Sequence, residues 1–210
     1  MDKINLDSIL NSKEYPKSRV PIEYVTKRMK ELGYVFSKEN KDIALLVVWY
    51  FLRDPLFLES KLVKNGNSFG KGLIIYGTYG IGKSMLFETL HKIGKELILE
   101  RGISDLWFVT CSAAAYVEDY MQHDGTRLGI KEMYKGKLYI DDLGFEKKVY
   151  NKTELLSDIL FERNRAKTMT FVTTNLTPHE VFERYGQRIA DRIPEMFNVI
   201  QWEGESLRKF

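Results

Sequence analysis

The sequence of 210 residues contains one cysteine, Cys111, and three histidines. A single cysteine forms no disulfide within its own chain and cannot build a cysteine-based zinc site. The histidines are far apart in the sequence, and their spacing is not that of metal ligands (His91, His123 and His179). These absences exclude a fold stabilised by disulfides or by structural zinc.

Long apolar runs and a strong excess of one charge are also missing. The most apolar run, residues 43–52, is about half the length that a helix needs to cross a bilayer. The first 17 residues lack the apolar segment of a signal peptide. The net charge is only +3, which permits nucleic-acid binding without indicating it. We therefore expect a cytoplasmic protein that has no contact with a membrane.

What the sequence does contain is an alternation of short apolar runs with longer helical stretches. The predicted strands are 73–76, 107–110, 138–141, 169–174 and 199–202. The predicted helices between them are 83–100, 113–122, 154–166 and 178–185. Two capping boxes mark helix starts, Asn151 with Glu154 and Thr177 with Glu180. This alternation predicts an α/β fold with a five-stranded parallel sheet covered by helices on both faces.

The first 60 residues have a different pattern. They predict two helices, 22–32 and 42–58, and contain no strand-like run. We therefore expect a small helical N-terminal region over residues 1–60, with a possible role in partner binding, and a nucleotide-binding domain over residues 61–210.

A complete phosphate-binding loop follows the first predicted strand. Residues 77–84 read GTYGIGKS and fit the pattern G-x-x-x-x-G-K-[ST] in full. The glycines let backbone N–H groups turn toward phosphate oxygens, and the helix that follows adds its positive N-terminal dipole. Lys83 is predicted to reach the β- and γ-phosphates, and Ser84 to bind magnesium. The predicted nucleotide-binding residues are Gly77, Thr78, Tyr79, Gly80, Ile81, Gly82, Lys83, Ser84 and the adjacent Met85.

Polar residues end the third and fourth predicted strands. Asp141 and Asp142 follow the apolar run 138–140. Asp141 suits the magnesium shell, and Asp142 suits the base that activates water. Asn175 ends the next strand, where it could sense the γ-phosphate, because ligands bind beyond the carboxyl ends of parallel strands.

Together these motifs resemble the DnaC/DnaI/IstB group of AAA+ ATPases, which includes bacterial helicase loaders and transposition helpers. The matching segments are GTYGIGKS (77–84), YIDDLG (139–144), TTNL (173–176) and YGQRIADRI (185–193). The resemblance implies an AAA+ P-loop fold, ATP and Mg²⁺ as ligands, and self-association with ATP bound between subunits. It also implies a replicative helicase and single-stranded DNA as partners.

The resemblance further implies roles for three arginines. Arg192 matches an arginine finger that acts on the adjacent subunit, and Arg208 resembles a sensor-2 arginine. Arg188, one turn before Arg192, could support either. Two departures from the wider superfamily matter: the sequence ends at Phe210 without a full C-terminal lid domain, and Asp142 is one methylene shorter than the usual glutamate.

Basic residues near the third strand are candidates for DNA contact. Arg127, Lys131, Lys135, Lys137 and Tyr134 lie in or beside the loop 125–136, and Lys147 and Lys148 follow the acidic motif. A solvated basic loop accounts for them equally well.

Three alternatives to a helicase loader stay open. A transposition helper that binds duplex DNA would have the same nucleotide site. A clamp that binds ATP with little hydrolysis is consistent with the short Asp142. A small-molecule kinase would need an arginine-rich lid, which the sequence does not contain.

Overall fold

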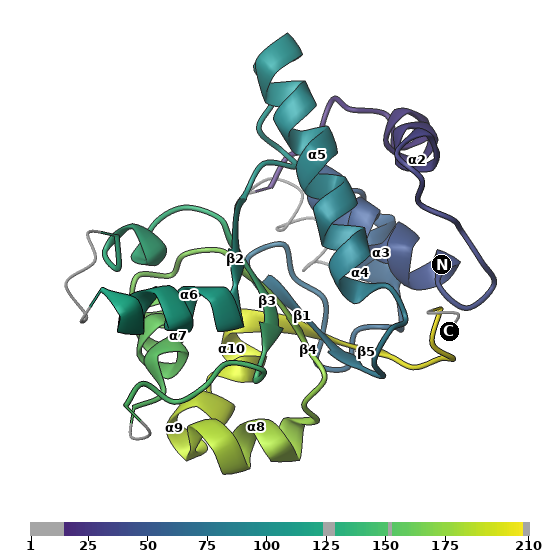
Figure 1. Ribbon diagram of the computed structural model, residues 1–210. Helices are drawn as coiled ribbons and strands as arrows, with labels where there is room; N and C mark the ends of the chain where they lie inside the picture. The colour runs from purple at the N-terminus through teal and green to yellow at the C-terminus, as the bar shows by residue number, and fades with distance from the viewer. Residues whose placement is uncertain (1–14, 124–128, 151–152, 208–210) are drawn as a thin grey trace. The chain divides into compact units, whose positions relative to one another are not determined.

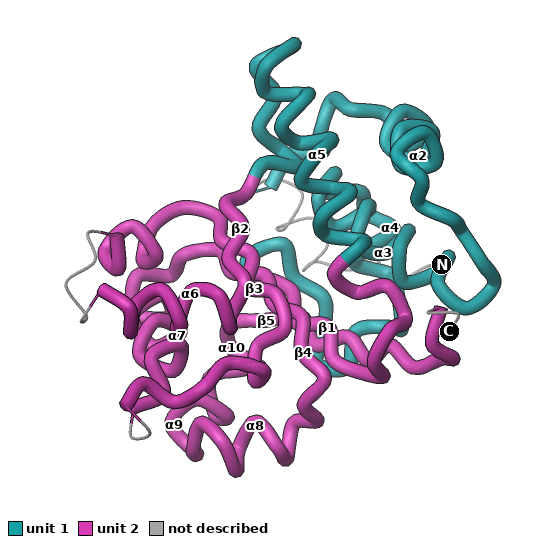
Figure 2. Tube along the Cα trace, in the orientation of Figure 1, with its two compact units in different colours: residues 1–70, 85–107 teal, residues 71–84, 108–210 magenta. Residues whose placement is uncertain are grey.

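The computed structural model describes residues 15–123, 129–150 and 153–207. The chain divides into two compact units (Figure 2). The first unit comprises residues 1–70 and 85–107, and the second comprises residues 71–84 and 108–210. The expected boundary at residue 60 does not coincide with this division, because the first unit also includes most of the helix that follows the P-loop.

The first unit is helical. It contains α2 (Ile22–Glu31), α3 (Lys41–Leu52), α4 (Leu56–Glu59) and most of α5 (Lys83–Arg101). Val25 and Met29 of α2 are fully buried, and Arg28 donates two hydrogen bonds to Glu96 of α5 at 2.8 and 2.9 Å. One face of α2 therefore packs into the core of this unit.

The predicted helix 42–58 is wrong in its length. The helix ends at Leu52, and Arg53 takes a left-handed conformation with φ of +52°. The chain then turns through Pro55, which precedes the short helix α4. Proline disfavours a helical conformation in the residue before it and lacks the N–H that would continue the helix, so the break falls here.

The second unit contains a five-stranded, fully parallel sheet, as predicted. Its strands are β1 (Gly72–Gly77), β2 (Val109–Ser112), β3 (Leu138–Leu143), β4 (Thr170–Thr174) and β5 (Phe197–Trp202). Their order is β2-β3-β4-β1-β5 (Figure 1). The carboxyl ends of β1, β3 and β4 therefore meet at one edge of the sheet, where ligands bind in open α/β folds.

Helices pack on one face of this sheet through alternate strand residues. Ile74, Ile140 and Val172 share one buried cluster with residues of the covering helices. These helices are α6 (Ala113–Gln122), α7 (Leu155–Arg165), α8 (Pro178–Tyr185), α9 (Gln187–Ala190) and α10 (Ile193–Met196). A 3₁₀ turn, Glu132–Tyr134, lies before β3.

Two local predictions need correction. The second strand begins at Val109 instead of Trp107, because Trp107 belongs to the first unit, where its ring lies 5.2 Å from that of His91. The first capping box is also wrong in its register, since Glu154 occupies the N-cap of α7 without a side-chain cap; Asn151 lies outside the described residues. The second box is confirmed: Thr177 and Glu180 cap α8, with Pro178 in its first turn.

No helix in the described part of the chain is long and apolar enough to cross a membrane.

Candidate nucleotide-binding site

The P-loop connects β1 to the start of α5. Gly77 has a φ of +149°, and a Cβ at this position would lie 1.7 Å from the carbonyl oxygen of Trp202 on β5. Only glycine fits such an approach. Further along the loop, the carbonyl oxygen of Gly80 accepts a hydrogen bond from the N–H of Leu207 at 2.9 Å. The tail after β5 therefore contacts the loop directly.

Lys83 lies at the centre of the loop and is almost fully buried. Its Nζ donates to the carbonyl oxygens of Gly77 and Thr78 at 2.9 and 2.7 Å, and to Oδ1 of Asn175 at 2.7 Å. Burial lowers the pKa of Lys83 to about 8, although the negative charges of Asp142 and Asp141 act in the opposite direction. The ammonium group thus hydrogen-bonds neutral oxygens here, and a bound phosphate would offer it a negatively charged oxygen instead.

The Asp141 carboxylate is connected to the P-loop through Ser84. Its Oδ1 accepts hydrogen bonds from the hydroxyls of Ser84 at 2.8 Å, Tyr139 at 2.5 Å and Thr173 at 2.6 Å. A serine hydroxyl beside a carboxylate is the oxygen ligand pair that Mg²⁺ uses in P-loop proteins. The residues present therefore fit a magnesium ion held by Ser84 and Asp141.

Asp142 lies at an irregularity in the sheet. The pairing of β3 with β4 shifts register between Ile140 and Leu143, and Asp142 has a φ of +51°. Its N–H donates to Oγ1 of Thr173 at 3.1 Å. A bulge of this kind turns successive side chains away from strict alternation, so both carboxylates reach the site edge instead of pointing to opposite faces.

Tyr139 and Thr173 are site residues that the sequence reasoning missed. The Tyr139 hydroxyl lies 2.9 Å from that of Thr173, and burial together with the Asp141 charge raises the pKa of Tyr139 well above its usual value. The signal for Tyr139 was present, because residues two apart on a strand share a face. The same rule applies to Thr173, which is two residues before Asn175 and is therefore expected on the same face as that residue.

The predicted finger arginine is not among these contacts. Arg192 lies after α9, where its guanidinium carbon is 5.0 Å from the ring centroid of Phe161 on α7. Arg188 stacks on the same ring at 3.4 Å, and Arg192 donates to the carbonyl oxygen of Arg188 at 2.5 Å. Arg208 lies outside the described residues, and Met85, the last predicted nucleotide-binding residue, has a partly exposed side chain.

The basic loops differ in what they offer to a nucleic acid. Lys131 and Lys135 are exposed, but Tyr134 is half-buried and packs against the core, so its ring is a poorer stacking face than the sequence suggested. Lys137 is half-buried, and Arg127 lies outside the described residues. Lys147 and Lys148 are exposed in the loop between β3 and α7.

This arrangement brings together the groups that handling a nucleoside triphosphate requires. Direct hydrogen bonds connect Lys83 to Asn175 and Ser84 to Asp141, and Asp142 is close enough to act on the charge of Lys83. A buried cation, a hydroxyl–carboxylate pair and a further carboxylate thus lie at the end of three neighbouring strands. Such a site can bind phosphates and magnesium and can take a proton from water.

Solved structures share this fold at low sequence identity. The structure of the DnaC helicase loader is 21% identical, with a TM-score of 0.59, and the match covers 87% of this chain and 99% of that one. The structure of DnaI is 21% identical, with a TM-score of 0.53, and the match covers 91% and 95%. A structure of the replication initiator DnaA bound to AMPPCP and single-stranded DNA is 16% identical with a TM-score of 0.56; the match covers 90% of this chain and 52% of the DnaA chain.

Neither a protein-family model nor a curated protein matches the sequence. The likeness to DnaC, DnaI and DnaA therefore rests on the path of the backbone. It establishes that the chain shares the fold of these structures.

Proposed function

We propose that this protein is an ATPase that serves DNA replication, and that it hydrolyses ATP in the site formed by Lys83, Ser84, Asp141, Asp142 and Asn175. The observation that supports this most directly is the hydrogen bonding of Lys83 to Asn175 and of Ser84 to Asp141. These contacts join the P-loop to the ends of two further strands, β4 and β3.

Each residue has a distinct role in the proposed reaction. Magnesium ATP supplies the phosphoanhydride bond that is hydrolysed and the positive charge that balances its phosphates. Lys83 binds phosphate oxygens through Nζ, and Ser84 and Asp141 hold the metal. Asp142 accepts a proton from the attacking water, and Asn175 orients that water or contacts the terminal phosphate.

We further propose that the site is completed by a second copy of the chain. Arg188 and Arg192 are held against Phe161, and no carboxylate pairs with either among the described residues. An arginine offered in this way can neutralise the charge that develops on a phosphate in the transition state of a neighbouring site. Hydrolysis then depends on self-association.

The partners we propose are a replicative helicase and single-stranded DNA. The similarity to the structures of the DnaC helicase loader and of DnaA bound to single-stranded DNA supports this assignment. The loop between β3 and α7 offers a suitable surface, because Phe145 and Tyr150 are 71% and 57% exposed on either side of Lys147 and Lys148. Exposed aromatic rings beside lysines can stack on bases while binding the backbone.

The test is DNA binding by fluorescence anisotropy, with single-stranded and duplex probes, with and without ATP. We expect an ATP-dependent preference for the single strand that is lost in Lys83→Ala. Replacing Lys147 and Lys148 by glutamine should weaken binding and reduce its salt dependence, whereas Lys167→Gln, an exposed lysine on another loop, is the matched control. A preference for duplex DNA would instead identify a transposition helper, and ATP binding without measurable turnover would identify a nucleotide-gated clamp.

A further inference from the structure

The loop that follows the acidic motif is fastened to α8 by a buried carboxylate. The side chain of Glu146 is 1% exposed, and its Oε2 accepts a hydrogen bond from the N–H of Gly144 at 2.8 Å. Its Oε1 accepts a hydrogen bond from the hydroxyl of Tyr185. Burial and the neighbouring Glu146 charge raise the pKa of Tyr185 above its usual value, so this hydroxyl stays a donor.

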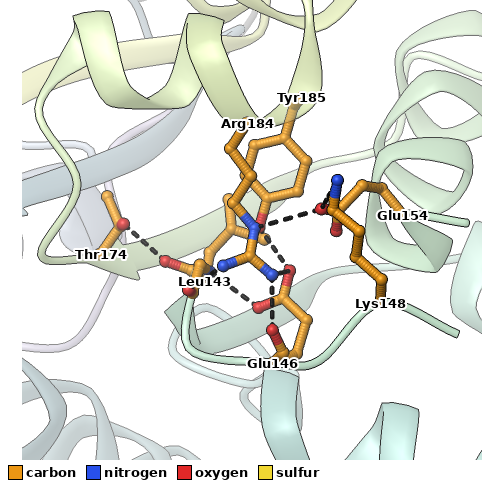
Figure 3. Close-up of polar contacts among 8 residues, drawn as sticks. Leu143, Glu146, Lys148, Glu154, Thr174, Arg184 and Tyr185 are labelled. Carbon is orange, nitrogen blue, oxygen red and sulfur yellow. Dashed lines mark hydrogen bonds and ion pairs between the residues drawn. The ribbon is translucent and has the colours of Figure 1, made fainter. Parts of the chain in front are cut away.

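Arg184 completes the connection from the same end of α8 (Figure 3). Its guanidinium donates to the carbonyl oxygens of Gly144 and Glu146, the latter at 2.5 Å. It also forms ion pairs with the Glu146 and Glu154 carboxylates at 3.4 and 3.5 Å. We call Glu146, Arg184 and Tyr185 the polar clamp. The Glu146 carboxylate is the buried member of this set, so breaking its contacts would leave a charge unpaired away from water.

One end of the polar clamp lies beside the proposed catalytic base. The N–H of Phe145 donates to the carbonyl oxygen of Asp142 at 3.0 Å, and Gly144 is only two residues beyond Asp142. The carbonyl oxygen of Leu143 accepts a hydrogen bond from Thr174 at 2.6 Å (Figure 3). Hydrogen bonds within residues 142–146 therefore connect the loop of the polar clamp to the backbone of Asp142, and Leu143 connects it to the end of β4.

The other end continues directly into α9, and the proposed finger Arg192 follows two residues after the end of that helix. Tyr185 is the last residue of α8, and only Gly186 separates it from α9. The carbonyl oxygen of Gly186 accepts a hydrogen bond from Ile189, whose own carbonyl oxygen accepts one from Arg192. Hydrogen-bonded backbone therefore runs from Gly186, the residue after Tyr185, to Arg192.

We propose that Glu146, Arg184 and Tyr185 are positioning residues that make the placement of Asp142 and that of Arg192 depend on each other. This inference rests on the proposed function, since it assigns Asp142 to the subunit's own site and Arg192 to its neighbour's site. The polar clamp would let the state of one site alter the arginine offered to the next.

Hydrogen exchange tests the mechanical part of this inference in the full chain without nucleotide. Tyr185→Phe removes one hydroxyl from α8 and should speed exchange of the amides of residues 143–149. Glu146→Gln removes the negative charge that Tyr185 and Arg184 contact from the loop side, and it should speed exchange of the amides of residues 187–192. Each effect should be about ten- to 150-fold, as expected for the loss of one hydrogen bond to a charged group. Glu183→Gln, an exposed residue of α8, is the control and should change neither segment.

Mixed subunits test the functional part. Lys83→Ala subunits cannot use ATP but offer Arg192, and Arg192→Ala subunits have a complete site but no finger, so a mixture of the two should regain turnover. Adding Glu146→Gln to the Lys83→Ala subunit should lower kcat of the mixture with KM for ATP unchanged, and Glu183→Gln should not.

The outcomes separate the two claims. Unchanged exchange in the distant segments would overturn the polar clamp, and so would normal kcat with the substituted donor. A third outcome is that exchange changes as expected but the mixture of Lys83→Ala and Arg192→Ala subunits does not regain turnover. That result would support the polar clamp and overturn the proposal that Arg192 acts on the neighbouring subunit.

Discussion

One oxygen of Asp141 accepts hydrogen bonds from three hydroxyl groups. Ser84 is a proposed magnesium ligand, so the other two hydroxyls, those of Tyr139 and Thr173, serve to position the carboxylate. Thr173 is central to this set, because its hydroxyl donates to Asp141 at 2.6 Å and accepts the N–H of Asp142 at 3.1 Å. One side chain on β4 thus holds both acidic residues of β3.

We therefore expect Thr173→Val, which keeps the shape and removes the hydroxyl, to weaken magnesium-dependent nucleotide binding. Partners that orient a metal ligand typically contribute about 10- to 100-fold to metal affinity. The measurement is nucleotide affinity over a magnesium titration, with Thr173→Ser expected to restore it. If valine and serine variants bind alike, the hydroxyl does not position Asp141.

The lowered pKa of Lys83 leads us to expect that nucleotide affinity depends on pH. Its pKa is lowered to about 8 by burial, and phosphate binding requires the charged form. Below pH 8 the free protein already carries the charge, so affinity should be flat. Above pH 8 binding must take up a proton, and affinity should fall by up to about tenfold per pH unit.

The matched variant for this prediction is Lys83→Arg. A guanidinium in solution stays protonated above pH 12, so the affinity of this variant should be lower but without the slope above pH 8. Calorimetry in buffers of different ionisation heat would count the proton taken up. An equal slope in both proteins would assign the titration to another group.

At the scale of elements, a buried arginine connects α7 to the segment before β3. Arg163 is fully buried, and it donates to the carbonyl oxygens of Met133, Lys135, Gly136 and Met169 at 2.5 to 3.2 Å. It also donates to the Thr170 hydroxyl at 2.8 Å, and burial lowers its pKa to about 10. The Arg163 side chain thus donates hydrogen bonds both to the segment around the turn Glu132–Tyr134 and to the start of β4.

Arg163→Met should therefore destabilise the chain by about 3–5 kcal/mol, because it leaves several buried carbonyl oxygens without a hydrogen-bond donor. The measurement is urea unfolding. Arg165→Met, at an exposed position of the same helix, should change stability by less than about 0.5 kcal/mol. A small loss for Arg163→Met would mean that water replaces the guanidinium.

Element boundaries show what periodicity can and cannot decide. Helix α8 starts where predicted, because its capping box and proline are local signals. Strand β2 does not, because its start depends on pairing with Leu138, which lies 29 residues further along the chain. The predicted helix 42–58 is too long because apolar residues continue through α3 and into α4. The apolar pattern therefore gives no sign of the break before Pro55.

At the scale of the whole molecule, assembly should control turnover. We expect ATPase activity per chain to rise with protein concentration and Arg192→Ala to retain ATP binding while losing about 10³-fold or more in kcat, as for other arginine fingers. Sedimentation with and without ATP would follow the assembly, and Arg165→Ala is a suitable surface control. Full activity in Arg192→Ala would remove this residue from the mechanism.

The structure also changes how a role of the N-terminal region in helicase binding must be tested. Deleting residues 1–40 would remove Val25 and Met29 from the core of the first unit and would break the partly exposed Arg28–Glu96 ion pair. Val35 is 74% exposed, so Val35→Asp probes partner binding without that loss.

The sequence alone determined the P-loop, the acidic strand end, the sensor-like asparagine and the parallel sheet, because each depends on residue types at short spacing along the chain. Only the tertiary structure decided that Thr173 holds Asp141, that a register shift brings Asp142 to the same edge, and that Glu146 joins α8 to the acidic motif. These contacts join residues 31 to 40 positions apart or depend on strand pairing, and no local pattern specifies which polar groups will meet when strands and helices pack.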